Sequence, residues 1–293
     1  MSSSTVKCQE GLGFLSEVSS ETVDLILTDP PYIISKDSGM DAHKKKIDSG
    51  TSGKTKKEWE TFLASHKEIE TTVKGAKTNF LKYGSPYGKK YAVATQYGEW
   101  DSDFTLEKLG VFIEQFYRVL KPGGTCIIFF DLWKIGDLKG LMESVKFKQI
   151  RLIEWIKTNP QPINSKVNYL TNCREIAVLG IKGAKPTFNS SYDKGIYEFP
   201  LQGGKDRFHP TQKSLLMFEE IIKKHSNEGD TVLDCFLGSG TTAVASLKQK
   251  RNFKGCEQNE EYVEKGKMIL KRVRGEMGQE SEAEESEAEW SDD

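Results

Sequence analysis

The segment Asp234-Cys235-Phe236-Leu237-Gly238-Ser239-Gly240-Thr241-Thr242-Ala243 connects a short apolar run to an amphipathic pattern. This order predicts a strand, a glycine-rich turn and a helix, which is the local structure that binds nucleotide-type cofactors. Glycines let the backbone approach a ligand, and a helix N-terminus offers free N–H groups to a carboxylate or a phosphate. The segment is not a P-loop, because no Gly-Lys-Ser/Thr follows it.

A carboxylate beyond this turn indicates the kind of cofactor. Gly238-x-Gly240-x-x-Ala243 fits a loose dinucleotide-binding pattern, and Glu257 ends the next predicted strand. An acid at that place accepts hydrogen bonds from the hydroxyls of a ribose. The glycines alone could form a plain strand-to-helix turn, whereas the glycines together with Glu257 favour a ribose-bearing cofactor.

Strands and helices alternate along most of the chain. Apolar runs predict strands at residues 23–28, 125–130, 150–156, 175–180, 231–235 and 253–256. Helical periodicity predicts helices at residues 105–120, 135–145, 214–225, 242–248 and 260–273. The alternation predicts an α/β fold, with a doubly wound and mostly parallel Rossmann-like sheet.

Charge is distributed unevenly along the chain. The formal net charge is only −1, but residues 276–293 hold nine acids and no Lys or Arg, so residues 1–275 carry a net +8. We interpret residues 1–275 as the folded domain, with a basic, partly mobile insertion at residues 37–98, and residues 276–293 as a disordered acidic tail. A basic body favours a polyanionic partner, with which the tail could compete.

Several classes of protein are excluded at this stage. No run approaches the ~18 apolar residues of a membrane span, and the N-terminus has no secretory pattern. The five cysteines and four histidines are scattered without ligand spacing, so no metal site is predicted. We therefore expect an intracellular protein that binds no membrane.

A second chemical site is predicted at Asp29-Pro30-Pro31-Tyr32, at the carboxyl end of the first strong apolar run. Sheets of this class bind ligands at the carboxyl ends of their strands. Prolines stiffen the backbone and remove N–H donors, which leaves the Pro30 carbonyl as a bare acceptor. Two acceptors, from Asp29 and Pro30, and the ring of Tyr32 suit a planar heterocycle with an exocyclic amino group.

Three motifs together resemble a known family. Asp29-Pro30-Pro31-Tyr32, His209-Pro210-Thr211-Gln212-Lys213 and Asp234-x-Phe236-x-Gly238-Ser239-Gly240-Thr241-Thr242 follow one another in the order of the β class of S-adenosylmethionine-dependent DNA amino-methyltransferases. The resemblance covers roughly residues 5–35 and 99–273. It implies methylation of adenine N6 or cytosine N4 on a base turned out of the DNA helix.

The resemblance also implies roles for individual residues. Asp29 and the Pro30 carbonyl would accept hydrogen bonds from the target amino group, Pro31 would complete the turn, and Tyr32 would stack on the base. The implied cofactor contacts are Glu10, Asp29, His209, Thr211, Gln212, Lys213, Asp234, Phe236, Gly238, Ser239, Gly240, Thr241, Thr242 and Glu257. S-adenosylmethionine is the implied cofactor.

The substrate follows less directly. Asp-Pro-Pro-Tyr resembles the adenine-N6 branch of the family more than the cytosine-N4 branch, so we expect a DNA adenine methyltransferase of the kind found in restriction–modification systems. Double-stranded DNA is the expected partner, single-stranded DNA or RNA is an alternative, and a homodimer stays open. Residues 182–207 mix basic and aromatic side chains and are the candidate target-recognition region.

Other interpretations stay open on the sequence alone. A cytosine-N4 DNA enzyme and an RNA adenine methyltransferase are close variants of the first. A protein glutamine methyltransferase uses a similar Pro-Pro-Tyr turn but has its motifs in the reverse order. An NAD-linked oxidoreductase would use Gly238 and Gly240 but leaves residues 29–32 and 209–213 unexplained, and a non-catalytic DNA-binding subunit would need neither motif intact.

Overall fold

The computed structural model describes residues 3–32, 54–65, 69–83, 86, 104–160, 170–183, 185–203 and 212–289. The chain forms two compact units. The larger one comprises Met1–Tyr32 and Phe104–Asp293, and the smaller one is Ile33–Asp103. The smaller unit takes in the basic insertion predicted at residues 37–98.

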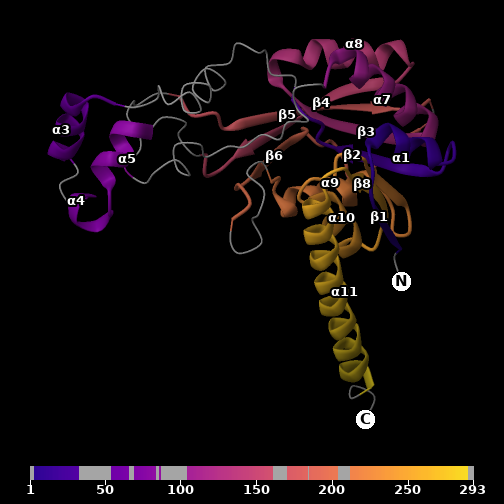
Figure 1. Cartoon of the computed structure of the whole chain (residues 1–293). Helices are drawn as coiled ribbons and strands as arrows, with labels where there is room; N and C mark the ends of the chain where they lie inside the picture. The colour runs from indigo at the N-terminus through magenta and orange to yellow at the C-terminus, as the bar shows by residue number, and fades with distance from the viewer. Residues whose placement is uncertain are drawn as a thin grey trace. The chain divides into compact units, whose positions relative to one another are not determined.

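Among the described residues of the larger unit, eight strands form one sheet in the order β1-β8-β7-β2-β3-β5-β4-β6 (Figure 1). The strands, in this order, are Ser4–Cys8, Asn252–Glu257, Thr231–Asp234, Val23–Thr28, Leu120–Phe130, Arg174–Ile181, Lys148–Lys157 and Ile196–Phe199. Only β5 runs antiparallel to its neighbours, β3 and β4, among these described pairs. The doubly wound, mostly parallel sheet predicted from the sequence is confirmed.

Helices cover both faces of this sheet (Figure 1). One group comprises α1 (Gly11–Glu17), α7 (Leu106–Val119) and α8 (Ile135–Ser144), the last preceded by the short helix η2 (Leu132–Lys134). The other group comprises α9 (Leu215–His225), α10 (Thr241–Lys248) and α11 (Glu260–Glu289). Stacking of Phe129 in β3 on Phe218 in α9, with ring centroids 5.6 Å apart, joins the sheet to the second group.

The smaller unit has a core of its own. Its described helices are α3 (Lys56–Ser65), α4 (Ile69–Thr72) and α5 (Ala76–Tyr83). Trp59, Ile69 and Phe80 are buried together, and the rings of Trp59 and Phe80 lie 5.3 Å apart. The sequence predicts a basic, partly mobile insertion at residues 37–98, and these few apolar residues are enough to pack three short helices within it.

The C-terminal segment differs from the expectation of a disordered tail. The predicted last helix ends at residue 273, but α11 continues to Glu289 and takes in most of the acidic segment. Glu, Ala, Gln and Met dominate residues 276–289, and all of them favour helices. No proline interrupts the run, so net charge alone does not end the helix.

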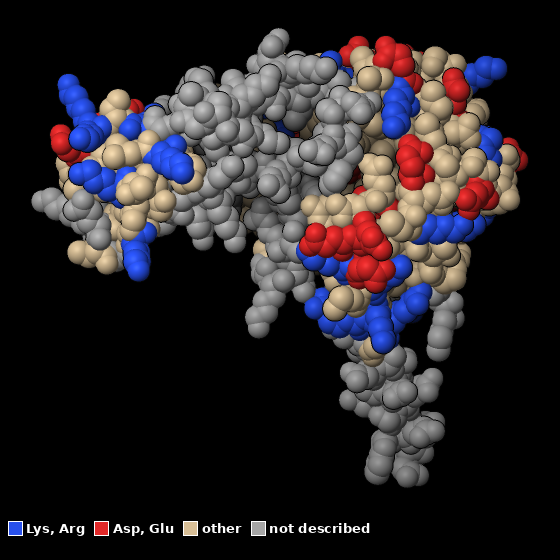
Figure 2. All heavy atoms as spheres, viewed as in Figure 1, with Lys and Arg blue, Asp and Glu red and all other residues tan. Residues whose placement is uncertain are grey.

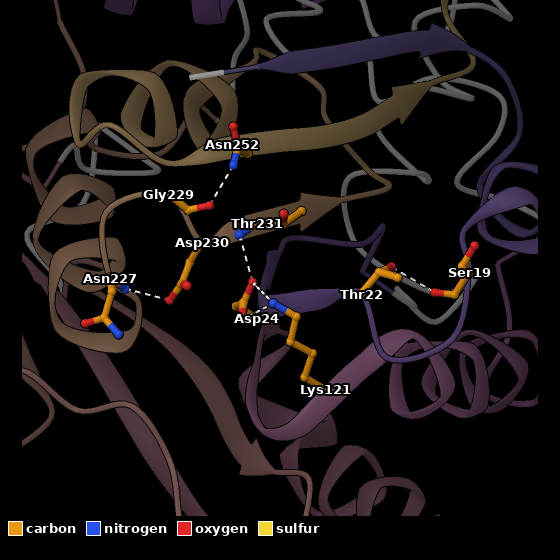
Figure 3. Close-up of polar contacts among 9 residues, drawn as sticks. All are labelled: Ser19, Thr22, Asp24, Lys121, Asn227, Gly229, Asp230, Thr231 and Asn252. Atoms are coloured by element: carbon orange, nitrogen blue, oxygen red, sulfur yellow. Dashed lines mark hydrogen bonds and ion pairs between the residues drawn. The ribbon is translucent and has the colours of Figure 1, made fainter. Parts of the chain in front are cut away.

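At the amino ends of the central strands, one carboxylate of β2 joins the two neighbouring strands (Figure 3). Asp24 of β2 accepts hydrogen bonds from Lys121 Nζ of β3 at 2.7 and 2.9 Å and from the backbone N–H of Thr231 in β7 at 2.9 Å. The turn before β7 is closed nearby, where Asn252 Nδ2 donates to the Gly229 carbonyl at 2.6 Å. These contacts fix the register of β7, β2 and β3, whose opposite ends form the site described below.

We predict that Asp24→Ala lowers the free energy of unfolding by about 1–3 kcal/mol, because it leaves the Thr231 N–H and the Lys121 ammonium without their acceptor. Urea unfolding monitored by circular dichroism measures this. The control is Glu143→Ala, which breaks an exposed pair with Lys139 and should cost less than about 0.5 kcal/mol. Equal losses in the two variants would contradict a special role for Asp24.

Candidate active site

The carboxyl ends of β2 and β7 lie next to each other, because the two strands pair in parallel through Leu25–Val232 and Ile26–Leu233. From this pair the strand order leads toward β8 and β1 on one side and toward β3 on the other. Open α/β sheets bind ligands in the crevice formed where the strand order reverses in this way. Asp29 follows β2 and Asp234 ends β7, so both predicted sites meet at this edge.

Asp234 is buried and joins the two strand ends. Its Oδ1 accepts hydrogen bonds from Thr28 Oγ1 at 2.6 Å and from the Phe236 N–H at 3.0 Å, and its Oδ2 accepts one from Thr242 Oγ1 at 2.7 Å. Burial raises the pKa of Asp234 to about 6, although these hydrogen bonds lower it. Since both carboxylate oxygens accept hydrogen bonds from the protein, Asp234 holds the glycine-rich turn, the predicted ligand-binding turn, against the end of β2.

The glycine-rich turn has the geometry that the sequence requires. Gly238 and Gly240 have positive φ angles of 51° and 79°, a conformation that side chains disfavour. A Cβ at either position would make only ordinary van der Waals contacts, at 3.9 Å to the Phe236 carbonyl and 3.8 Å to Gly266 Cα, so the positive φ angles and not crowding favour glycine here. Glu257 holds the turn, because its Oε2 accepts from the Gly238 N–H and its Oε1 from the Asn259 N–H, each at 2.9 Å.

Hydroxyl groups line the start of α10. Ser239 Oγ and Thr241 Oγ1 lie 2.9 Å apart and share a hydrogen bond, and both residues are buried. Thr242 is also buried, and its Oγ1 donates a hydrogen bond to Asp234. The turn and the first residues of α10 therefore form one rigid, polar surface, as the predicted cofactor contacts require.

Phe236 belongs to an aromatic cluster beside this turn. Its ring centroid lies 4.7 Å from that of Phe112 and 5.5 Å from that of Phe104. The N-terminus of α1 packs closely here, since a Cβ on Gly11 would come within 2.7 Å of the Phe112 ring. Glu10 caps α1 by accepting from the N–H groups of Leu12 and Gly13 at 2.8 and 3.1 Å. Glu10 thus directly precedes Gly11, which lies against the Phe112 ring of the cluster that contains Phe236.

Asp29 stands beside a buried ammonium group. Lys213 Nζ lies 2.6 Å from Asp29 Oδ2 and 2.8 Å from Glu175 Oε2, and only 7% of the Lys213 side chain is exposed. Asp29 Oδ1 and the Tyr32 hydroxyl are buried, and neither meets a donor or acceptor with bonding geometry among the described residues. The Tyr32 ring packs edge-on against Phe130 at 6.0 Å. One carboxylate oxygen is therefore engaged and the other is bare.

Charge and burial act together on these groups. Burial raises the pKa of Asp29, and Lys213 lowers it in part. Burial alone would lower the pKa of Lys213, but Asp29 and Glu175 raise it well above its usual value. Burial also raises the pKa of the Tyr32 phenol. The site is thus a carboxylate and a protonated lysine held together out of bulk water.

The remaining predicted residues divide into two groups. Pro30 is buried and Pro31 partly buried, next to Asp29. Gln212 is partly buried and adjoins Lys213. His209 and Thr211 lie outside the described residues.

We found no group of three or more His, Cys, Asp or Glu side chains able to hold a metal ion in the part of the chain that the structure describes. The same residues contain no helix with the length and apolar character of a membrane span.

Two functional candidates were missed in the sequence. Glu175 is the second residue of β5 and Lys157 ends β4, and their side chains lie 2.7 Å apart beside Lys213. Neither belongs to a motif. The sequence feature that could have identified Glu175 is its place directly before the continuous apolar run at residues 176–181. A charged side chain next to a buried strand is a candidate for a functional role.

The candidate recognition region, residues 182–207, is divided by the topology. β5 ends at Ile181, at the edge opposite Asp29, and residues after it are fixed to α9: Asn189 Nδ2 donates to the Ser226 carbonyl at 2.8 Å. Tyr197 in β6 is buried. β6 runs parallel to β4, so among the described residues of this region those at 200–203, after Phe199, lie toward the edge of Asp29. The recognition role itself stays a prediction.

Comparison with known proteins identifies the family. A family model described as DNA methylase matches residues 23–268. The chain belongs to this N6/N4 DNA methylase family. It is therefore an S-adenosylmethionine-dependent DNA methyltransferase, as the three motifs imply, and not an NAD-linked oxidoreductase.

Individual relatives agree with this assignment. Type II methyltransferase M2.DpnII of Streptococcus pneumoniae is 28% identical over 282 residues, which span 90% of this chain and 87% of the relative. Type II methyltransferase M2.LlaDCHI of Lactococcus lactis subsp. cremoris is 31% identical over 199 residues, which span 61% of this chain and 74% of the relative.

Solved structures share the fold. The structure of M1.HpyAVI superposes with a TM-score of 0.57 at 25% identity, covering 91% of this chain and 98% of that one. The PvuII DNA methyltransferase, described as cytosine-N4-specific, gives a TM-score of 0.60 at 15% identity and covers 93% of both chains. At that identity the likeness concerns the fold alone.

We predict that Asp234 makes stability depend on pH. Because its folded pKa of about 6 lies above that of an unfolded aspartate, the folded protein binds the extra proton, and stability falls as pH rises through this window. Relative to Asp234→Asn, the wild type should lose about 1–2 kcal/mol of unfolding free energy between about pH 5 and 7.5. Urea unfolding at a series of pH values measures this.

The control for Asp234 is Asp137→Asn, which changes an exposed aspartate in the first turn of α8. Its unfolding free energy should follow that of the wild type at every pH. Parallel curves for Asp234→Asn and the wild type would show that Asp234 is not responsible.

Proposed function

We propose that the chain transfers a methyl group from S-adenosylmethionine to the exocyclic N6 amino group of adenine in double-stranded DNA, with the target base turned out of the helix. The observation that carries this proposal is the bare, buried Oδ1 of Asp29, beside the Tyr32 ring and at the ligand-binding edge of the sheet. A hydrogen-bond acceptor next to an aromatic face suits an amino-substituted heterocycle and little else.

The nucleophile must be activated by its surroundings. An amino group on an aromatic ring is a poor nucleophile, because its lone pair is delocalised into the ring. If Asp29 Oδ1 and the Pro30 carbonyl accept its two hydrogens, the nitrogen is drawn toward a tetrahedral shape and its lone pair is directed at the methyl group. Proline lacks an N–H, so this turn offers acceptors without a competing donor.

Lys213 keeps Asp29 in the state that this role needs. Burial favours the neutral acid, which would present a hydrogen to the amino group, whereas the ammonium 2.6 Å from Oδ2 favours the carboxylate. The methylated nitrogen then releases a proton, which the nearby carboxylate is placed to accept. Lys213 therefore acts on Asp29, and the cofactor contact that the motif implies for it stays a prediction.

The residues around the glycine-rich turn fit the cofactor. When bound, S-adenosylmethionine supplies an electrophilic methyl group on a cationic sulfur. The positive φ angles of Gly238 and Gly240 shape the turn that is assigned to its amino-acid part, and Phe236 is assigned to the adenosine. Glu257 has both oxygens on backbone N–H groups but retains lone pairs for a ribose hydroxyl. Glu10, one residue from the aromatic cluster, is assigned to the adenine.

Adenine is preferred over cytosine because an aspartate stands first in the 29–32 motif, where the cytosine-N4 branch more often has serine. On the face in Figure 2, Lys and Arg side chains are interspersed with Asp and Glu over the larger unit. Mixed charge of this kind favours local phosphate contacts over one extended basic patch.

The direct test is incubation with unmethylated duplex DNA and labelled S-adenosylmethionine, followed by nucleoside chromatography. Label in N6-methyl-deoxyadenosine is expected. Label in N4-methyl-deoxycytidine would replace adenine by cytosine as the target, and label only with RNA or single strands would change the substrate. No label in any nucleic acid would overturn the proposal.

Asp29→Asn should lower the turnover number by about a hundredfold or more, because the isosteric amide keeps the shape but removes the negative charge from the acceptor. Steady-state methylation of duplex DNA measures this, and calorimetric titration checks that the variant still binds cofactor. The matched control, Asp137→Asn, should turn over like the wild type. Turnover of Asp29→Asn within about twofold of the wild type would remove Asp29 from the reaction.

A further inference from the structure

Four side chains of alternating charge form a row that ends at Asp29. Lys157 Nζ lies 2.7 Å from Glu175 Oε1, and the other Glu175 oxygen, Oε2, lies 2.8 Å from Lys213 Nζ. Lys213 Nζ in turn lies 2.6 Å from Asp29 Oδ2. The exposed fractions of these side chains are 13%, 19%, 7% and 24% in the order Lys157, Glu175, Lys213, Asp29.

The row reaches across the sheet. Lys157 is the last residue of β4, Glu175 lies at the start of β5, Lys213 precedes α9, and Asp29 follows β2. Antiparallel pairing of β4 with β5 sets Trp155 opposite Glu175. Residues two apart in a strand lie on the same face, so Lys157 shares the face of Trp155 and Glu175. No motif contains Lys157 or Glu175, and folding alone brings them to the site.

Glu175 has a specific electrostatic consequence for Asp29. Among the described residues, Lys213 is the cation paired with Asp29, and an ammonium that faced one carboxylate alone would offset more of its charge. Here the ammonium is shared, because Glu175 Oε2 also forms an ion pair with it at 2.8 Å. Lys157 stabilises the ionised form of Glu175 and fixes its position. Sharing the ammonium therefore leaves more of the negative charge of Asp29 on its bare oxygen.

We propose that Glu175 and Lys157 are positioning residues for methyl transfer, which hold the Lys213 ammonium on Asp29 Oδ2 so that Oδ1 stays free and negatively charged to accept the target amino group. This rests on the proposed function of Asp29, but it does not depend on whether the base is adenine or cytosine. Both residues act through Lys213 and touch neither base nor cofactor.

The signs of two substitutions test this. Among the described residues, the groups facing Asp29 are Lys213, Glu175 and Tyr32. Asp234 is near enough to interact electrostatically, and Lys157 is one place further along the row. Glu175→Gln removes a negative charge that raises the pKa of Asp29, so the acid limb of the turnover number against pH should move to lower pH. Lys157→Met removes a positive charge and strengthens the pull of Glu175 on Lys213, so its acid limb should move to higher pH.

Each shift should be on the order of half a pH unit or more. Turnover on the plateau should fall about tenfold or more in Glu175→Gln, because the ammonium then neutralises Asp29 alone and draws it out of position. Cofactor affinity measured by titration should stay within about threefold of the wild type, since neither residue is assigned to the cofactor. Both substitutions nearly conserve volume, and thermal unfolding confirms that the variants are folded.

The matched control is Glu154→Gln. Glu154 and Arg174 form an ion pair at 2.9 Å between the same two strands, on the opposite face. Loss of this pair should leave turnover and the acid limb unchanged. Thr28→Val removes a hydrogen bond from Asp234 but not from Asp29. An acid limb that moves with Thr28→Val and not with Glu175→Gln belongs to Asp234 and overturns the proposal.

The outcomes separate this inference from the proposed function. If the wild type methylates no nucleic acid, the proposed function fails first. If the wild type is active but Glu175→Gln and Lys157→Met shift the acid limb in the same direction, or leave it and the plateau at wild-type values, only the positioning role is overturned. Opposite shifts with a Glu154→Gln control like the wild type support it.

Discussion

The carboxylate of Asp234 is the interaction on which the rest of the site depends. It binds Thr28 at the end of β2 and Thr242 at the start of α10, so it holds together the catalytic loop and the cofactor turn. These segments lie far apart in the sequence, and each carries a motif. Because the carboxylate is buried, its hydrogen bonds are strong, and they fix the distance between the two halves of the reaction.

The sequence predicted the parts of the fold that local chemistry controls. Glycines with positive φ at Gly238 and Gly240, the acid Glu257 and the proline turn after β2 all lie where the motifs placed them. The alternation of strands and helices gave the sheet, because apolar runs and helical periodicity report burial directly. The convergence of Asp29 and Asp234 on one edge follows from parallel pairing alone.

The sequence could not predict what depends on long-range pairing. Glu175 reaches the site only because β5 runs antiparallel between β3 and β4, and nothing local distinguishes its direction. In residues 182–207 the basic and aromatic side chains differ in their surroundings: Lys182 donates to the Leu120 carbonyl and Tyr197 is buried, whereas Phe188 and Tyr192 are exposed. Residues 276–289 were predicted to be disordered because of their net negative charge, whereas their residues have high helix propensity and belong to α11 in the structure.

The reversed strand also has a topological consequence. β4 ends and β5 begins at the same edge as Asp29, so the chain between Lys157 and Arg174 leaves and re-enters the sheet without crossing it. A connection of this kind needs no crossover helix, and its length is independent of the register of either strand. Residues can therefore be inserted into or deleted from the connection between β4 and β5 while the row from Lys157 to Asp29 is preserved.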